Sequence, residues 1–282
     1  TQFDASDLPT QIAGEIEGFD PADYIDRKEA RRIPRSSQIA LAAAIQAIDD
    51  AGLPKIMANP ERSSVVFGTA IGGIDRVVDG LDIMREHGYS RINPFTLPAG
   101  LPNMPAFLMA REFQCLGHNI TITTACATST QTIGEGAELI RRGVADVVIA
   151  GGTEALIRDF SFAGFCAMRA MPINFNDRPE KASRPFDAAR EGFIFSEGAG
   201  ALILESLEHA QARGARIYAE MAGHASSADG FHMAALEPDA AGPIRAMRWA
   251  LADAGISASE VDYINPHGTS TPANDPNETR AI

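Results

Sequence analysis

The sequence predicts an α/β fold in which layered helices cover a mainly buried sheet. Along the chain, short runs of β-branched and apolar residues alternate with segments whose apolar residues recur at helical spacing. Two of the runs, ADVVIAGG (145–152) and GALILES (200–206), are almost wholly apolar, which is typical of strands buried on both faces. With 282 residues, of which 45% are hydrophobic, the chain is long enough to bury a sizeable core.

The first expected elements are a helix over residues 36–52 and a strand over residues 63–69. Apolar residues in the helical segment recur at i, i+4 and i+7, and Gly52 ends the pattern. The strand SSVVFGT is rich in β-branched residues and leads into a glycine-rich turn, AIGG (70–73). These glycines indicate turns and close packing, because the segment lacks the GK[ST] of a phosphate-binding loop.

The middle of the chain continues the alternation of helices and strands. Residues 103–113 have a helical pattern, and NITITT (119–124) predicts a strand. A further helix is expected from Ser129 to Arg142, because two arginines followed by Gly143 are typical of a helix C-terminus.

A faint internal repeat connects the two ends of the chain. AIQAIDDAGLP (44–54) and MRWALADAGIS (247–257) share the tripeptide Asp-Ala-Gly, and each precedes an expected strand and a loop rich in Gly and Thr. The second of these strands is VDYIN (261–265). Chance similarity between two amphipathic helices is the alternative explanation. A true repeat predicts two related halves of one unit, the first over about residues 1–205 and the second beginning over about residues 206–282.

Composition and charge narrow the class of protein. No apolar run approaches the ~18 residues of a membrane span, and the first ten residues do not resemble a signal peptide. The formal net charge is −13, from 24 basic and 37 acidic residues, which disfavours generic nucleic-acid binding. The three cysteines show no metal-type spacing and no disulfide framework. We therefore expect a cytoplasmic protein with neither a membrane nor a nucleic acid as its partner.

The strongest candidate for chemistry is Cys126, within TITTACATSTQTIGEG (121–136). The strand pattern ends near Thr124 and a helix begins within a few residues, so the thiol should face the open N–H groups and the positive end of the helix dipole. Both features favour the thiolate, and a sharp strand-to-helix turn can present a nucleophile. The alternative, a lone cysteine acting as a small buried hydrophobe, fits Cys115 and Cys166 better.

A candidate partner is His267, in NPHGTSTPANDP (265–276). A lone histidine is more often structural, but this one follows an expected strand, and ligand sites of open α/β sheets lie beyond strand ends. A nucleophilic cysteine and a positioned histidine can form an acyl-transfer pair. His232, in ADGFHM (228–233), is a weaker candidate for the same site.

Four motifs taken together resemble those of the β-ketoacyl-acyl carrier protein synthases. TTACATST around Cys126 resembles the active-site cysteine segment, and NPHGTSTPANDPNE resembles the first active-site histidine segment. Between them, ADVVIAGGTEA and ASRPFDAAREGFIFSEGAG resemble two further family signatures in the expected order. The resemblance covers nearly all of the chain. It is closest to the elongating type II enzyme of fatty acid synthesis, with polyketide ketosynthases next.

The resemblance implies a fold, an assembly and a reaction. The fold is the thiolase-like αβαβα layered duplication, here with its second half truncated, and the assembly is a homodimer. The reaction is decarboxylative Claisen condensation, in which Cys126 accepts an acyl group and malonyl-acyl carrier protein loses CO2 to supply the attacking carbanion. The backbone N–H of Cys126 would supply half of an oxyanion hole, and His267 would hydrogen-bond the malonyl thioester carbonyl. No cofactor or metal is implied, since phosphopantetheine of acyl carrier protein holds the substrates.

The resemblance also implies roles for residues around the two motifs. Ile71 and Phe165 match acyl-pocket positions, and Thr269 and Thr271 match positions that contact the pantetheine arm. His232 is kept as a further substrate-binding candidate. Asp275 and Glu278 match positions that support the site.

A basic segment gains a purpose from the resemblance. Residues 26–35, DRKEARRIPR, carry more basic than acidic residues, and a solvated helix start is the alternative reading. Carrier proteins are acidic, so an acidic synthase needs a local positive surface on which to dock them. The residues expected to form this surface are Lys28, Arg31, Arg32, Arg91 and Arg169.

Segments of the family pattern fall outside this chain at both ends. The strand and Gly-rich turn with which the family normally starts would precede Thr1. The Lys-Ser-x-x-Gly-His segment and the Gly-Phe-Gly-Gly-Thr loop would follow Ile282, so we expect the sequence to be an excerpt of a longer protein. Two alternatives to a condensing enzyme remain. One is a non-catalytic ketosynthase-like partner subunit that sets chain length in a dimer, against which Cys126 argues. The other is a degradative thiolase that uses coenzyme A, which HGTSTP fits less well.

Overall fold

A computed structural model describes residues 2–282, which divide into two units. The sheet unit comprises residues 16–156 and 197–220. The loop unit comprises residues 2–15, 157–196 and 221–282. The sheet unit carries the turn with Cys126, and the loop unit carries the loop with His267.

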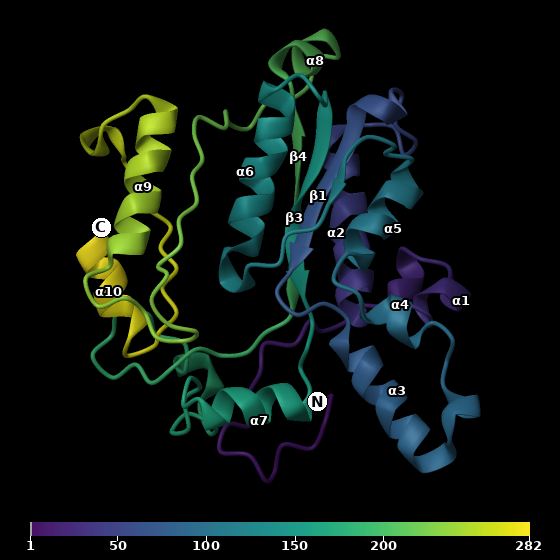
Figure 1. The fold of residues 1–282 in the computed structure, drawn as a ribbon, viewed down its shortest axis with the longest axis vertical. Helices are drawn as coiled ribbons and strands as arrows, with labels where there is room; N and C mark the ends of the chain where they lie inside the picture. The colour runs from purple at the N-terminus through teal and green to yellow at the C-terminus, as the bar shows by residue number, and fades with distance from the viewer. Residues whose placement is uncertain (1) are drawn as a thin grey trace. The chain divides into compact units, whose positions relative to one another are not determined.

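The sheet unit is built on four strands in the spatial order β2-β1-β3-β4 (Figure 1). β1 (Ser63–Thr69) runs parallel to β2 (Asn119–Ile120) on one side and to β3 (Val147–Glu154) on the other. β4 (Gly198–Glu205) is antiparallel to β3, and its last residue pairs with the first residue of β3. The carboxyl ends of β1, β2 and β3 therefore meet at one edge of the sheet, where ligand sites of such sheets are found.

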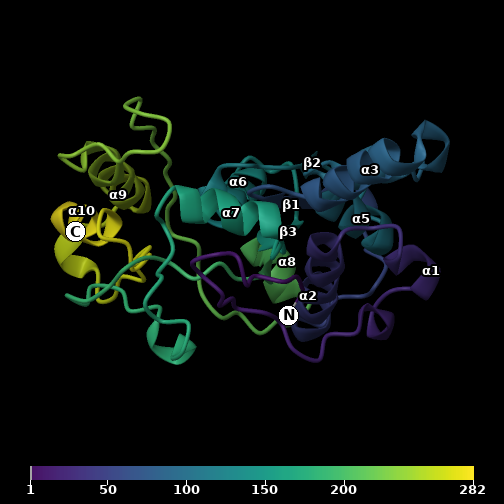
Figure 2. The same ribbon diagram turned by 90° about the horizontal axis from the view of Figure 1, so that it is seen from below.

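Helices cover both faces of this sheet. α6 (Thr128–Arg141) lies on one face, and α2 (Arg35–Ala51) and α5 (Met104–Phe113) lie on the other (Figures 1 and 2). Successive residues of β1 face opposite sides, so Val65 and Phe67 join the core under α2 and α5, whereas Val66 joins the core under α6. Burial on both faces explains why β1 and β3 are nearly continuous apolar runs.

The remaining helices are short or peripheral. In the sheet unit they are η1 (Pro21–Asp23), α1 (Arg27–Ala30), η2 (Pro60–Arg62), α3 (Ile74–His87), η3 (Tyr89–Arg91), α4 (Thr96–Gly100), η4 (Ala125–Ala127) and α8 (Leu207–Ala212). In the loop unit they are α7 (Asp159–Ala167), η5 (Pro179–Lys181), α9 (Ala241–Ala254), η6 (Ala258–Glu260) and α10 (Asn274–Ala281). Over residues 2–282, none of these helices has the length and apolar character needed to cross a bilayer.

Glycines let the first turns of α6 lie directly on the sheet. A Cβ on Gly68 of β1 would lie 2.1 Å from the carbonyl oxygen of Ile122 and 2.3 Å from Cγ2 of Thr128. A Cβ on Gly152 of β3 would lie 2.3 Å from Oγ of Ser129. Because real side chains do not tolerate such contacts, both positions require glycine. The close packing expected of the glycines of AIGG (70–73) is confirmed at Gly73, where a Cβ would lie 2.3 Å from the carbonyl oxygen of Ala99.

Most expected elements are confirmed, with ends displaced by one or two residues. The strand expected over 63–69 is β1, and the helices expected over 36–52, 103–113 and 129–142 are α2, α5 and α6. The two apolar runs form β3 and β4.

Two expected strands are wrong in part or entirely. The strand expected over residues 119–124 ends at Ile120, because the next residues bend so that the Ile122 carbonyl meets Gly68 and the Thr124 N–H bonds to the Thr128 hydroxyl. Residues 261–265 form no strand in the structure as described. A strand requires a neighbour for its backbone hydrogen bonds, and none pairs with this segment within residues 2–282.

The repeated Asp-Ala-Gly tripeptides end their helices in the same way. Gly52 after α2 and Gly255 after α9 both adopt left-handed backbone, with φ of 66° and 70°. The residue after each glycine donates its N–H five residues back, Leu53 to Ile48 at 3.1 Å and Ile256 to Leu251 at 3.1 Å. This is the Schellman pattern of helix termination, so the two helices of the repeat share a local structure as well as a sequence.

The contact at Gly68 generates a prediction about stability. Gly68→Ala forces a methyl group against a backbone carbonyl that cannot move independently, so we expect the free energy of unfolding to fall by about 1–3 kcal/mol. Urea denaturation measures this change. Gly200→Ala is the matched control, because a Cβ on Gly200 of the same sheet meets no atom within 4 Å. Equal stability of the two variants would contradict the close-packing role of Gly68.

Candidate active site

Cys126 lies on a tight, strained turn between the sheet and α6. The chain leaves β2 at Ile120 and forms the single turn η4 at Ala125–Ala127, and α6 begins at Thr128. Ala125, the residue before the cysteine, has a φ of 51°. Left-handed backbone at a residue with a Cβ costs roughly 1–2 kcal/mol. The surrounding structure must therefore hold this turn, which presents Cys126 as an exposed side chain.

Buried hydroxyl groups hold the turn in place. Thr128 is only 4% exposed. Its hydroxyl accepts the Thr124 N–H at 2.9 Å and so closes the turn around Cys126. One helical turn later, the Thr132 hydroxyl donates to the carbonyl oxygen of Gly151 in β3 at 2.8 Å. The first bond closes the turn and the second ties α6 to the sheet, which is why a strained conformation can persist there.

The position of the thiol suits it to anionic chemistry. α6 has 14 residues, and its N-cap residue, Ala127, has no polar side chain with which to cap the first turn. The N–H groups of Ala127 and Thr128 already donate to the carbonyl oxygens of Thr124 and Ala125. The N-terminal end of a helix carries partial positive charge. The dipole of α6 therefore favours a thiolate or an oxyanion at Cys126.

Ile71, the expected pocket residue, lies in the turn after β1, beside the strand that leads to Cys126. Glu154, the last residue of β3, accepts the Ile71 N–H at 3.1 Å and the Thr69 hydroxyl at 3.4 Å. Burial raises the pKa of the Glu154 carboxyl above its usual value, although backbone and hydroxyl donors act in the opposite direction. Glu154 lies within the motif ADVVIAGGTEA. Its hydrogen-bond partners are far away in the sequence, so the sequence did not predict its role.

In the loop unit, the loop with His267 is held by two carboxylates of α10. Glu278 accepts the backbone N–H groups of both His267 and Gly268, the second at 2.8 Å. Its Oε2 also accepts the Asn274 side-chain amide at 3.2 Å. The backbone of His267 is therefore fixed by a carboxylate eleven residues away, as a site-supporting role for Glu278 requires.

Asp275 joins the same loop to a distant segment of the loop unit. It is 1% exposed and accepts the N–H groups of Phe186 at 2.7 Å and Ser270 at 3.2 Å. Arg190 approaches the same carboxylate at 3.4 Å and donates to the carbonyl oxygen of Thr271 at 3.0 Å. A buried carboxylate needs such partners, so Asp275 and Arg190 together fix the path of the loop.

The hydroxyls of Thr269 and Thr271 lie 2.9 Å apart. The Thr271 hydroxyl also accepts the Asn274 N–H at 3.1 Å, which supports the start of α10. Between the two threonines, Ser270 is fully buried, has a φ of 66°, and accepts the Arg184 N–H at 3.0 Å. Contact of the two threonines with a pantetheine arm stays a prediction.

Sequence reasoning missed the residues that hold this loop from outside. Arg184, Phe186 and Arg190 all lie in ASRPFDAAREGF (182–193), a motif that we quoted without assigning roles to its members. The resemblance of this motif to a family signature was the sequence signal that could have identified these residues. In the structure they hydrogen-bond to Ser270, Asp275 and Thr271, which explains how they hold the loop.

The other expected substrate residues lie in separate places. Phe165 of α7 packs edge-to-face on Phe193, with ring centroids 5.2 Å apart, within the loop unit. The His232 ring nitrogen Nδ1 accepts the N–H groups of Ala234 and Ala235 at 3.1 and 3.0 Å, which stabilises an exposed turn. Cys126 belongs to the sheet unit and His267 to the loop unit. Within residues 2–282, no group of three or more His, Cys, Asp or Glu side chains could hold a metal ion.

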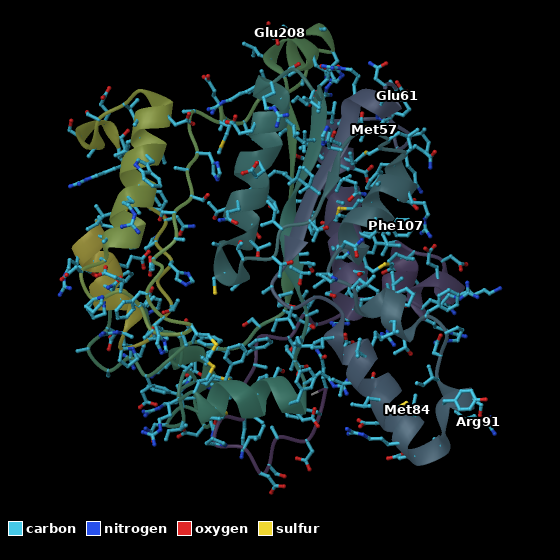
Figure 3. The ribbon with its side chains drawn as sticks, viewed as in Figure 1. Met57, Glu61, Met84, Arg91, Phe107 and Glu208 are labelled. Carbon is cyan, nitrogen blue, oxygen red and sulfur yellow. The ribbon has the colours of Figure 1, made fainter. Side chains whose placement is uncertain are left out.

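The expected docking residues of the sheet unit are exposed. Lys28 lies in α1, and Arg31 and Arg32 follow directly after it. The Arg32 guanidinium lies over the ring of Phe95, 5.2 Å from its centroid. Arg91 ends η3, and Figure 3 shows it beyond the last turn of α3, near Met84. Arg169 is exposed in the loop unit.

Family models match nearly the whole chain. The model described as "Beta-ketoacyl synthase, N-terminal domain" matches residues 1–210, and "Beta-ketoacyl synthase, C-terminal domain" matches residues 218–282. The chain belongs to the beta-ketoacyl synthase family. The boundary that we expect near residue 205 stays a prediction.

Curated beta-ketoacyl synthases resemble the chain over its full length. A protein of Synechocystis sp. named "3-oxoacyl-[acyl-carrier-protein] synthase 2" is 46% identical over 282 residues, which are 100% of this chain and 68% of that protein. A protein of the same name from Coxiella burnetii is 44% identical, with 100% of this chain and 68% of that protein covered. The chain thus spans about two thirds of the length of these relatives.

Solved structures give the same fold. A beta-ketoacyl synthase from Burkholderia phymatum superposes with a TM-score of 0.89 at 35% identity, covering 97% of this chain and 66% of that one. The structure named "The ishigamide ketosynthase/chain length factor" superposes with a TM-score of 0.89 at 36% identity, covering 100% of this chain and 68% of that one. These ketosynthase neighbours confirm the expected thiolase-like α/β fold.

The three cysteines of this ketosynthase should differ sharply in reactivity. Cys115 is buried, and burial raises the pKa of its thiol to about 12. Cys126 is exposed at the start of α6, so we expect iodoacetamide at neutral pH to modify it at least ~10-fold faster than Cys115. Peptide mass spectrometry over time measures both rates, with the partly exposed Cys166 as an internal control. Equal, slow labelling at all three sites would contradict an activated Cys126.

Proposed function

We propose that this chain carries the acyl-accepting cysteine of a 3-oxoacyl-acyl carrier protein synthase that elongates a fatty acyl chain. The observation that carries the proposal is Cys126, exposed on a strained turn at the start of α6 in a member of the beta-ketoacyl synthase family. The relatives from Synechocystis and Coxiella, which match the full chain, are named for this activity.

The proposed reaction has two stages that share one thiol. In the first stage, the Cys126 thiolate attacks the thioester carbonyl of an acyl-carrier protein, and the carrier thiol leaves. In the second stage, malonyl-carrier protein loses CO2, and its carbanion attacks the acyl-Cys126 carbonyl to form a carbon–carbon bond. The Cys126 thiolate then leaves, and the 3-oxoacyl chain is held by the carrier. The cysteine returns to its starting state, so one site can act repeatedly.

Backbone and side-chain donors would stabilise the charges that develop. Each tetrahedral intermediate at Cys126 carries an oxyanion, and we propose that the Cys126 N–H, in η4 before α6, donates to it. We propose that His267 hydrogen-bonds the malonyl thioester carbonyl as negative charge accumulates there. The hydrogen bonds from His267 and Gly268 to Glu278 support this role, because they hold the histidine backbone before substrate binds.

The proposed partner is acyl carrier protein. A similar solved structure is described as a type II polyketide synthase acyl-carrier protein in complex with its ketosynthase. It is 35% identical with a TM-score of 0.81, and the match covers 88% of this chain and 62% of that one. In this chain, Lys28, Arg31 and Arg32 form an exposed positive surface at α1 despite a net charge of −13. Such a local surface would attract an acidic carrier and orient it.

A second copy of the chain is the other proposed partner. Large apolar side chains are exposed from α3 to α5, where a monomer would be expected to carry polar residues. Figure 3 shows Met84 on α3 and Phe107 on α5, which are 39% and 46% exposed. Leu97 and Leu101, at 70% and 51%, extend the same stretch of chain. We propose that homodimer formation covers these side chains, and that the enzyme works in the reducing cytoplasm that a thiol nucleophile needs.

A second candidate function is a non-catalytic partner subunit that sets chain length. The neighbour named for both a ketosynthase and a chain length factor supports this possibility. Cys126 and the turn that presents it favour the catalytic function, because a subunit without chemistry would have no need of this thiol.

Replacing the thiol tests the proposed function. In the full-length protein, Cys126→Ala should lower formation of 3-oxoacyl product by more than ~1,000-fold, since the covalent intermediate cannot form. The assay supplies acyl- and malonyl-carrier protein and quantifies the product by mass spectrometry. Cys166→Ala is the matched control and should retain activity. Undiminished condensation by Cys126→Ala would refute the assignment.

Charge reversal tests the docking surface. The double variant Lys28→Glu/Arg31→Glu should weaken carrier-protein binding by at least ~10-fold, and wild-type binding should weaken as salt rises. Titration calorimetry at two ionic strengths measures both effects. Arg142→Glu, at the end of α6, is the matched control, because Arg142 is also exposed but lies at the other end of the sheet. An unchanged dissociation constant in the double variant would remove these residues from the interface.

A further inference from the structure

Glu154 places a carboxylate beneath the turn that carries Ile71. β1 and β3 are parallel neighbours, and Thr69 at the end of β1 pairs with Thr153, one residue before Glu154. Both strands end at the same edge of the sheet. The Glu154 side chain can therefore reach the turn 70–73 that leaves β1.

The carboxylate accepts hydrogen bonds from the turn, from the end of β1 and from the residue that follows Glu154. Oε2 accepts the Ile71 N–H at 3.1 Å and the Thr69 hydroxyl at 3.4 Å, and Oε1 accepts the Ala155 N–H at 3.3 Å. The Thr69 hydroxyl in turn accepts the Gly72 N–H at 3.0 Å. A side chain that only accepts hydrogen bonds is the type that this set of donors requires.

The turn has little room to adopt another path. Gly72 has a φ of 77°, and a Cβ there would lie 3.0 Å from Cα of Pro102. A Cβ on Gly73 would lie 2.3 Å from the carbonyl oxygen of Ala99. Ile71 is the one large side chain of AIGG (70–73), and it is only partly buried. The position of the Ile71 backbone thus decides where this side chain points.

The turn also adjoins the Cys126 turn. β1 lies between β2 and β3, and Gly68 at its end touches the carbonyl of Ile122 on the way to Cys126. The turn 70–73 therefore has the nucleophile's turn on one side and Glu154 on the other.

Holding a carboxylate in this place carries a cost in stability. Burial raises the pKa of the Glu154 carboxyl in the folded protein. The free energy of unfolding therefore falls as the pH rises from the ordinary glutamate pKa to the raised one, because the carboxyl ionises more readily in the unfolded chain. A neutral side chain would avoid this cost. The carboxylate instead supplies the acceptors that the Ile71 N–H and the Thr69 hydroxyl use.

We propose that Glu154 is a positioning residue that, through its hydrogen bonds to the Ile71 turn, sets the acyl-chain preference of Cys126. The inference rests on the proposed function, because it takes Ile71 as one wall of the acyl pocket. Glu154 would not touch the substrate. It would act by fixing how far Ile71 extends into the space beside the nucleophile.

The test compares Glu154→Gln with wild type in the full-length protein. The first readout is kcat/KM for acylation of Cys126 by carrier proteins with short, medium and long acyl chains. We expect the ratio between the longest and shortest chains to change at least ~10-fold, equivalent to about 1.4 kcal/mol. The second readout is amide hydrogen exchange, which should accelerate at Ile71. The rate of iodoacetamide modification of Cys126 should stay within ~2-fold, because this small reagent does not depend on the pocket wall.

Glu205→Gln is the matched control, since it makes the same substitution in the same sheet. Glu205 ends β4, pairs with Val147 at the start of β3, and bonds to Arg213 and His209. It therefore lies at the opposite end of the sheet, where Figure 3 labels Glu61 and Glu208. Neither the acyl-chain ratio nor Ile71 exchange should change in this variant.

The outcomes separate the inference from the proposed function. If wild type condenses normally and Glu154→Gln has an unchanged acyl-chain ratio, the role of Glu154 is overturned and the proposed function stands. Wild type that is not acylated at Cys126 would refute the proposed function, and the pocket role with it. If Glu154→Gln does not fold, Thr69→Val replaces it and Thr69→Ser is its control. Thr69→Val should shift the ratio while Thr69→Ser retains it, and equal ratios in the two would overturn the inference.

Discussion

The site depends first on the direct contact between the start of α6 and the sheet. Gly68 and Gly152 remove the side chains that would separate them, and Thr132 bonds across the contact to Gly151. Because the backbone is held from below, the turn at Ala125–Ala127 can keep a conformation that an isolated peptide would abandon. The exposure of Cys126 at the end of a helix is thus a consequence of packing beneath it.

Carboxylates fix loops within each of the two units. Glu154 holds the turn after β1, and Asp275 and Glu278 hold the loop with His267, in each case by accepting backbone N–H groups. A loop cannot satisfy its own donors as a helix or strand does, so a carboxylate that accepts several of them selects one loop path among several. The two units use the same physical device, although their folds differ.

The sequence predicted the elements whose signals are local. β1 has its expected bounds, because a run of β-branched residues that leads into glycines is enough to predict a strand. Cys126 was predicted for a similar reason, because the strand end and the helix start around it are close to it in the sequence. The segments 119–124 and 261–265 were misjudged, since strand formation depends on a neighbour as well as on composition. Glu154 and Arg190 were not assigned roles because their partners lie far away in the sequence. Contacts between residues far apart in the sequence produce no periodic pattern from which they could be predicted.

The charge around α1 shows why net charge alone misleads about partners. The segment's two acidic residues are both engaged: the Asp26 carboxylate caps α1 by accepting the N–H groups of Lys28 and Glu29, and Glu29 pairs with Arg111. Their negative charge is thereby offset locally, whereas the basic side chains of Lys28, Arg31 and Arg32 remain exposed. A positive surface can therefore exist on a chain of net charge −13, because the field close to a surface follows the nearest charges. The proposed docking of an acidic carrier follows from this local arrangement.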